Sequence, residues 1–125
     1  MKILIAESSL LIAERLTRSL NELPGIENIM HASDVAEVLC SINGQLPDVA
    51  IVDPRIAGSK GVELLKNIKR QGPRVFLIVL SNSFYRVHRR RCLEAGADYF
   101  LDKSNEFNLV PGLVRDIQNL VLTTP

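Results

Sequence analysis

Short apolar runs and amphipathic segments alternate five times along this 125-residue chain. A short, continuous apolar run bounded by turn residues is typical of a strand buried on both faces of a sheet. Such runs predict strands at about Lys2–Ala6, Asn28–Ala32, Val49–Val52, Val75–Leu80 and Asp98–Leu101. Apolar residues at helical spacing follow each strand. They predict helices at about Ser9–Glu22, Ser33–Asn43, Gly61–Gln71, Phe84–Ala95 and Glu106–Leu122.

Turn and breaker residues separate these elements. Glycine and proline end several of the helices, and the stretch Pro54–Lys60 is expected to form a loop. Pro111 belongs in the first turn of the last helix, or marks a later start, because a proline in the interior would break it. Strands that alternate with helices predict an α/β fold, a parallel sheet covered by helices on both faces. Right-handed crossovers then place the carboxyl ends of all strands at one edge.

Length and charge narrow the class of protein. The chain fits a single domain over residues 1–125 that is large enough to bury a core. The net charge of +1 indicates no strong attraction to nucleic acid or to an anionic membrane. No apolar stretch is long enough to span a bilayer, and Met1 leads directly into a strand without a signal peptide, so we expect a cytoplasmic protein. Cys40 and Cys92 are expected to be free thiols.

Polar residues follow four of the predicted strands and should therefore meet at one edge of the sheet. Glu7 follows the first strand, Asp53 the third, Ser81 the fourth and Lys103 the fifth. Asp53 is the most informative of these residues, because the carboxyl ends of strands in open α/β sheets line the crevice where ligands bind.

These residue types suit the transfer of a phosphoryl group. A carboxylate can attack phosphorus to give an aspartyl phosphate. The reaction brings charged oxygens together and needs positive charge, which Mg²⁺ held by one or two carboxylates and a lysine ammonium can supply. A hydroxyl can donate one hydrogen bond to a phosphoryl oxygen. Asp53, Glu7, Lys103 and Ser81 match these four roles in type and in predicted place.

Six short segments extend this pattern over nearly the whole chain. They are Ile3–Glu7, Ile51–Asp53, Gly61–Leu65, Val79–Ser81, Ala95–Phe100 and Leu101–Lys103. In this order and at this spacing they resemble a bacterial two-component response-regulator receiver domain of the CheY-like type. The resemblance implies a flavodoxin-like (βα)5 three-layer sandwich with a parallel five-stranded sheet of order 2-1-3-4-5.

The resemblance also implies residue roles in phosphorelay signal transduction. By it, Asp53 is the phosphoacceptor, Lys103 the phosphate-pairing lysine, Ser81 the switch hydroxyl and Phe100 the aromatic residue that changes rotamer with it. The phosphoryl group would come from a sensor histidine kinase or a phosphotransfer protein, and it adds about −1.5 to −2 charges. The resulting movement would reshape the face formed by the fourth helix, fifth strand and fifth helix, for a downstream protein target or a second copy. Such a domain is a switch and not a turnover enzyme.

The chain departs from the receiver pattern beside the first strand. Receivers carry two adjacent acids there, whereas Glu7 is followed by Ser8. We expect Mg²⁺ to bind through Glu7, Asp53 and the Arg55 backbone carbonyl, but more weakly than in the family. The Arg55 side chain can grip phosphate through two hydrogen bonds and is expected to replace part of the missing charge.

Other interpretations remain open at this point. The loss of one acid is compatible with a pseudo-receiver, a phosphorylation-independent protein–protein interaction module of the same fold. Flavodoxins also share the fold, but the chain lacks a Ser/Thr/Gly-rich phosphate loop and a tryptophan for a flavin. The basic predicted helix, which carries Arg86, His88, Arg89, Arg90 and Arg91, indicates a solvated or partner-binding face more than a DNA-binding one. An output domain can follow residue 125.

Overall fold

Five parallel strands form one sheet in the order β2-β1-β3-β4-β5, which confirms the predicted topology. The computed structural model describes residues 1–82 and 86–123. Its strands are β1 (Lys2–Ala6), β2 (Asn28–Ala32), β3 (Val49–Val52), β4 (Phe76–Ser81) and β5 (Tyr99–Asp102). Its α-helices are α1 (Leu10–Asn21), α2 (Val35–Gly44), α3 (Gly61–Gln71), α4 (Arg86–Glu94) and α5 (Val110–Thr123).

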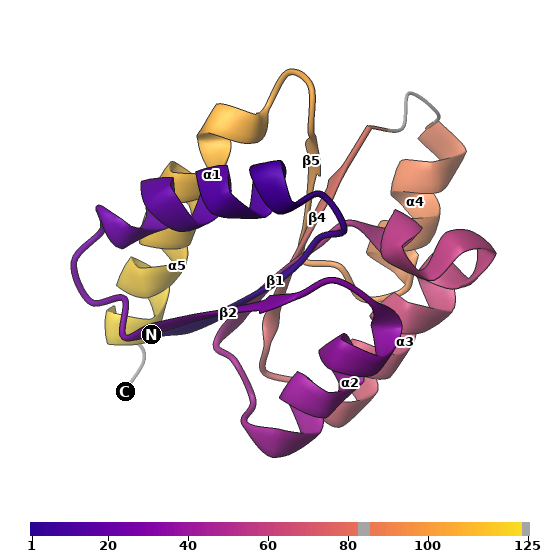
Figure 1. Ribbon diagram of the computed structural model, residues 1–125, viewed down its shortest axis with the longest axis horizontal. Coiled ribbons are helices and arrows are strands. Elements are labelled where there is room, and N and C mark those ends of the chain that lie inside the picture. The colour runs from indigo at the N-terminus through magenta and orange to yellow at the C-terminus, as the bar shows by residue number, and fades with distance from the viewer. Residues whose placement is uncertain (83–85, 124–125) are drawn as a thin grey trace.

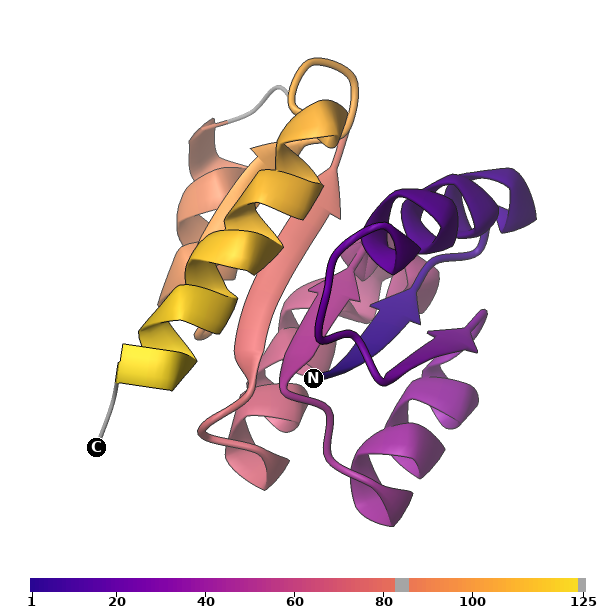
Figure 2. The same cartoon turned by 90° about the vertical axis from the view of Figure 1, so that its left-hand side faces the viewer.

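The helices cover the sheet in two layers, and each layer encloses its own core. Figure 1 shows α1 and α5 on one side of the sheet and α2, α3 and α4 on the other, and Figure 2 shows the same sandwich turned by 90°. Successive strand residues point to opposite faces. In β1, Ile3 and Ile5 therefore pack with α1 and α5, whereas Leu4 and Ala6 pack with the opposite layer. Over residues 1–82 and 86–123, no helix is long and apolar enough to cross a membrane.

Two segments differ from the sequence prediction. The expected loop Pro54–Lys60 is a 3₁₀ helix, η1, kinked at Gly58, where φ is 57°. The last helix starts later than expected, because a 3₁₀ turn, η2 (Phe107–Leu109), precedes α5. Pro111 lies in the first turn of α5, where its missing N–H costs no helical hydrogen bond. The predicted start of the fourth helix at Phe84 lies outside the described residues.

A close approach at Gly61 brings η1 against the start of α3. A Cβ atom at position 61 would lie 2.7 Å from the Pro54 carbonyl oxygen, a distance that a larger residue could not keep. Pro54 follows Asp53 directly, so this contact fixes the backbone on the carboxyl side of β3. The close packing of Gly61 against Pro54 thus helps to position Asp53.

The two cysteines differ in environment, and this leads to a labelling prediction. Cys92 of α4 is fully buried, and burial raises the pKa of its thiol to about 11, whereas Cys40 is exposed on α2. Because the thiolate is the reactive form, we expect a maleimide to label Cys40 rapidly and Cys92 only after unfolding. Intact mass spectrometry, with and without guanidinium, measures this. Rapid double labelling of the native protein would contradict the buried position of Cys92.

Candidate functional site

The predicted site residues do lie at one edge of the sheet. Ala6 pairs with Val52 in the β1–β3 register, so Glu7 and Asp53, the next residue of each chain segment, leave the sheet side by side. The Asp53 amide donates to the Ala6 carbonyl at 3.0 Å. Farther along the same edge, the Lys103 amide donates to the Ser81 carbonyl at 3.0 Å.

A buried ion cluster joins three of these residues. The Lys103 ammonium donates to Oδ2 of Asp53 at 2.6 Å and to Oε1 of Glu7. The side chains of Lys103, Glu7 and Asp53 are 9%, 5% and 8% exposed, so the cluster is largely screened from water. Burial by itself lowers the pKa of Lys103, but its hydrogen bonds with Asp53 and Glu7 and their negative charges outweigh burial and raise it. Lys103 is therefore a cation between two carboxylates at neutral pH.

Backbone amides hold the outer oxygens of both carboxylates. The Ser9 amide donates to Oε2 of Glu7 at 3.1 Å, and the Arg55 amide donates to Oδ1 of Asp53 at 3.0 Å. Ser9 is also the N-cap of α1, because its Oγ accepts from the Ile12 amide. The start of α1 and the start of η1 thus orient Glu7 and Asp53.

Side chains of the loop after β5 hold Lys103 in place. The Asp102 amide donates to the Glu106 carboxylate at 2.9 Å, and the Glu106 amide donates to the Asp102 carbonyl at 2.7 Å. The Asp102 carboxylate accepts from the Ser104 amide and from the Asn105 side chain. These bonds close the chain into a tight turn around Lys103. The sequence analysis did not predict these hydrogen bonds, because the only sign of them in the sequence is a run of short polar residues after β5.

Ser81 and Phe100, on the neighbouring strands β4 and β5, both contact α4. Ser81 is 1% exposed, and its Oγ lies 3.4 Å from Nε2 of His88. Phe100 is already buried among the α4-side core residues, and its ring meets the His88 ring edge-on, 5.8 Å between centroids. The guanidinium of Arg89 lies 5.9 Å from the centre of the Phe100 ring. Sequence reasoning named His88 only as part of a basic helix.

Glu7 and Asp53 fit a magnesium site that has few protein ligands. Glu7 and Asp53 hold one cation between them, the Lys103 ammonium, so both carboxylates face a common point. Mg²⁺ is commonly held by one or two carboxylates together with phosphate and water. Residues 1–82 and 86–123 contain no group of three His, Cys, Asp or Glu residues arranged to hold a metal ion. Ser8, where receivers carry the second acid, is exposed.

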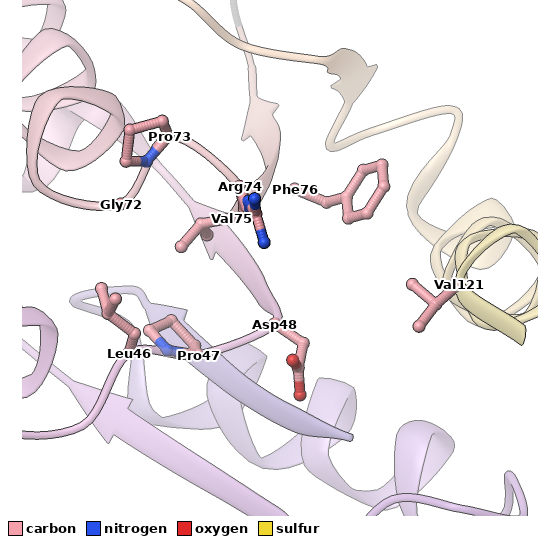
Figure 3. Close-up of a pocket in the computed structure, with 9 residues that line it drawn as sticks. All are labelled: Leu46, Pro47, Asp48, Gly72, Pro73, Arg74, Val75, Phe76 and Val121. Carbon is pink, nitrogen blue, oxygen red and sulfur yellow. The ribbon is translucent and has the colours of Figure 1, made fainter. Parts of the chain in front are cut away.

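Arg55 lies at the start of η1, next to a cavity that residues of α4 also line. It is exposed and lines a cavity of about 370 Å³ between η1 and α4, together with His88 and Arg91. Another cavity, of about 400 Å³, is shown in Figure 3. That cavity lies at the opposite edge, where β3 and β4 begin, and none of the predicted site residues lines it.

Comparison with known proteins identifies the family. A profile of the response regulator receiver domain matches residues 3–114, so the chain belongs to this family. The receiver domain of Francisella response regulator 1452 superposes with a TM-score of 0.83 at 26% identity, covering 96% of this chain and 98% of that one. The response regulator domain of Thermotoga maritima CheB, at 21% identity, shares the fold with a TM-score of 0.81 over 100% of this chain and 98% of that chain.

Curated relatives are longer proteins. Protein-glutamate methylesterase/protein-glutamine glutaminase 2 of Koribacter versatilis is 28% identical over 106 residues, which are 84% of this chain and 29% of that protein. The DNA-binding transcriptional activator EvgA of Escherichia coli K12 is 25% identical over 73 residues, 58% of this chain and 36% of that protein. This chain thus spans about a third of these relatives. Receiver domains serve phosphorelay signalling and are generally not enzymes themselves.

Proposed function

We propose that Asp53 accepts a phosphoryl group from a sensor histidine kinase or a phosphotransfer protein. The observation that carries this proposal is the buried Asp53 carboxylate, held by the Lys103 ammonium at 2.6 Å beside Glu7. A carboxylate oxygen forms the new O–P bond while the N–P bond of the donor's phosphohistidine breaks. The leaving imidazole nitrogen takes up a proton.

Residues of this chain supply much of what the transfer needs. The Arg55 amide and the Lys103 ammonium each bond one Asp53 oxygen, so the nucleophile is oriented before the donor arrives. Lys103 also stays near the added charge and can pair with a phosphoryl oxygen. Mg²⁺, when bound by Glu7, Asp53 and the Arg55 carbonyl, would neutralise charge on the transferring group. The side chain of Arg55 is near enough in sequence to add a second cation.

The signal would leave through the surface of α4, β5 and α5. This surface contains a cavity of about 650 Å³ whose lining includes Phe100, Leu93 and Leu109. Leu93 and Leu109 are 38% and 55% exposed, and apolar side chains gathered at a cavity are suited to a protein partner. Because Phe100 belongs to both the cavity and the neighbourhood of Ser81, a shift at Ser81 would alter this surface. The partner would be a cytoplasmic protein target or a second copy of the chain.

Phosphorylation with a small donor tests the proposal. The protein is incubated with phosphoramidate in Mg²⁺ or in EDTA, and intact mass and peptide mapping follow the modification. We expect the mass of one phosphoryl group, on the peptide that contains Asp53, with Mg²⁺ and little without it. Because the chain has no tryptophan, tryptophan fluorescence cannot replace mass detection. An unmodified protein under all donor and metal concentrations would contradict the proposal.

The Glu7 carboxylate should set the magnesium requirement. With Glu7→Gln, one of the two candidate anionic ligands is lost, so we expect the Mg²⁺ concentration for half-maximal phosphorylation to rise at least about tenfold, a typical effect of weakening a metal site. Glu14→Gln, an exposed change on α1, is the matched control and should behave as the wild type. Equal Mg²⁺ dependence of both variants would place the metal elsewhere.

A phosphorylation-independent adaptor is the second candidate. Two observations favour it: Ser8 stands in place of the second acid, and Lys103 already bridges both carboxylates as a built-in cation. In this case the α4-β5-α5 surface would bind its partner without modification. The absence of labelling, together with partner affinity that Asp53→Asn leaves unchanged, would support the adaptor over the switch.

A further inference from the structure

His88 of α4 contacts both residues that are predicted to switch. Its Nε2 lies 3.4 Å from the Ser81 hydroxyl, and its ring meets Phe100 edge-on at 5.8 Å. The same nitrogen lies 3.7 Å from Sγ of Cys92. Ser81 and Cys92 are 1% and 0% exposed, whereas His88 is partly exposed. One imidazole nitrogen therefore has two buried hydrogen-bond donors beside it.

The protons on Ser81, Cys92 and His88 limit which hydrogen bonds these three side chains can form at the same time. The Ser81 hydroxyl carries one proton and can donate it to one acceptor at a time. Cys92 keeps its proton at neutral pH, since burial raises the pKa of its thiol to about 11. When Nε2 of His88 has no proton, its single lone pair can accept from one of these donors or be shared between them. A phosphoryl oxygen on Asp53 would need the Ser81 proton as well, and Nε2 would then keep only the weaker thiol donor of Cys92.

We propose that His88 is a positioning residue for the switch: as a hydrogen-bond acceptor it holds the Ser81 hydroxyl toward α4, and on phosphorylation it becomes the donor. This inference rests on the proposed function of Asp53. Ser81 keeps its proton and turns it toward the phosphoryl oxygen, while Nε2 gains a proton from water, or the ring proton moves from Nδ1 to Nε2 through solvent. Nε2–H then donates to a lone pair of Ser81 Oγ. The edge contact with Phe100 carries the ring's movement to the α4-β5-α5 surface.

The surroundings of the ring allow this exchange. Arg55 of η1 and Arg91 of α4 line the cavity that His88 also lines, and Arg89 of α4 lies over Phe100. The Lys103 ammonium and the carboxylates of Asp53 and Glu7 are further charges at the carboxyl edge of the sheet. A phosphoryl group would add about −1.5 to −2 charges at this edge, which favours a proton on the side of the ring that faces Ser81.

Imidazole ¹⁵N spectra of the whole chain test the inference, with beryllofluoride as the phosphoryl mimic. Nε2 of His31 lies 2.9 Å from the Glu7 carbonyl oxygen, which can only accept, so His31 supplies an internal reference for a protonated Nε2. We expect His88 to show an unprotonated Nε2 before addition and a protonated Nε2 afterwards. If backbone amides around Asp53 shift while the His88 pattern stays the same, the inference is wrong and the proposed function stands. If no amide near Asp53 shifts, both fail.

A double-mutant cycle adds a measurement that a merely structural role would not affect. His88→Leu removes the bond that holds Ser81 in the resting protein and also the bond that forms after phosphorylation. The second bond forms only after a proton has moved, so it is the weaker one, and beryllofluoride affinity should rise by up to about fivefold, the free energy of one net hydrogen bond. His88→Gln places an amide near the position of Nε2 and should return affinity toward the wild type. In a Ser81→Ala background, His88→Leu should have no effect, because the hydroxyl that it frees is absent. An equal rise in affinity without Ser81 would overturn the inference.

Discussion

Asp53→Asn should abolish phosphoryl transfer from a small donor, leaving no added mass under conditions that modify the wild type completely. The amide has no anionic oxygen to attack phosphorus. Glu7, the other carboxylate of the ion cluster, stays paired with the Lys103 ammonium. The wild type should gain one phosphoryl group, and Asp53→Asn should gain none. Intact mass spectrometry measures the modified fraction directly.

Asp116→Asn is the matched control for this result. Asp116 is an exposed aspartate of α5 that takes no part in the ion cluster of Lys103, Glu7 and Asp53. We expect this variant to gain one phosphoryl group, with peptide mapping placing it on Asp53. Modification of Asp53→Asn to the wild-type extent would show that the acceptor is another residue, and the phosphorelay proposal would then fail.

Lys103→Met should destabilise the fold by about 3 kcal/mol, near the lower end of the cost of leaving a buried charge without its partner. The methionine fills similar volume but leaves Glu7 and Asp53, both less than 10% exposed, facing each other as two carboxylates. Urea unfolding followed by circular dichroism gives the free energy of unfolding. Lys66→Met, an exposed change on α3, is the control and should stay close to the wild type.

The difference in the free energy of unfolding between the wild type and Lys103→Met should change with pH in one direction. The folded-state pKa of Lys103 is raised above its ordinary value of 10.5, so the ion cluster contributes its full stability below that pH and loses it as the pH rises through the folded value. The difference in the free energy of unfolding between wild type and Lys103→Met should therefore hold through the neutral range and narrow in strong alkali. Asp53→Asn should unfold no more easily than the wild type, because one ammonium and one carboxylate then remain. If Asp53→Asn destabilised the protein as much as Lys103→Met, the explanation by unpaired buried carboxylates would be wrong.

Local patterns were sufficient for most of the architecture. The buried runs at β1 and β3 are continuous in the sequence, and a parallel sheet needs such runs because helices cover both of its faces. The order of elements along the chain then places Glu7, Asp53, Ser81 and Lys103 at one edge. Element ends were less predictable. The composition of Pro54–Lys60 predicts a loop. In the structure this segment is a 3₁₀ helix, and Gly61 at its end packs closely against Pro54 at its start.

The sequence by itself determined the class of fold, the edge that carries the polar residues and Asp53 as the central carboxylate, because these follow from hydrophobic periodicity and chain order. Only the tertiary structure decided which of these groups touch. Lys103, fifty residues beyond Asp53, bridges it to Glu7, and Ser81 meets His88 of α4. Such contacts depend on strand register and on the rotation of a helix against the sheet, and the packing of the whole core sets both.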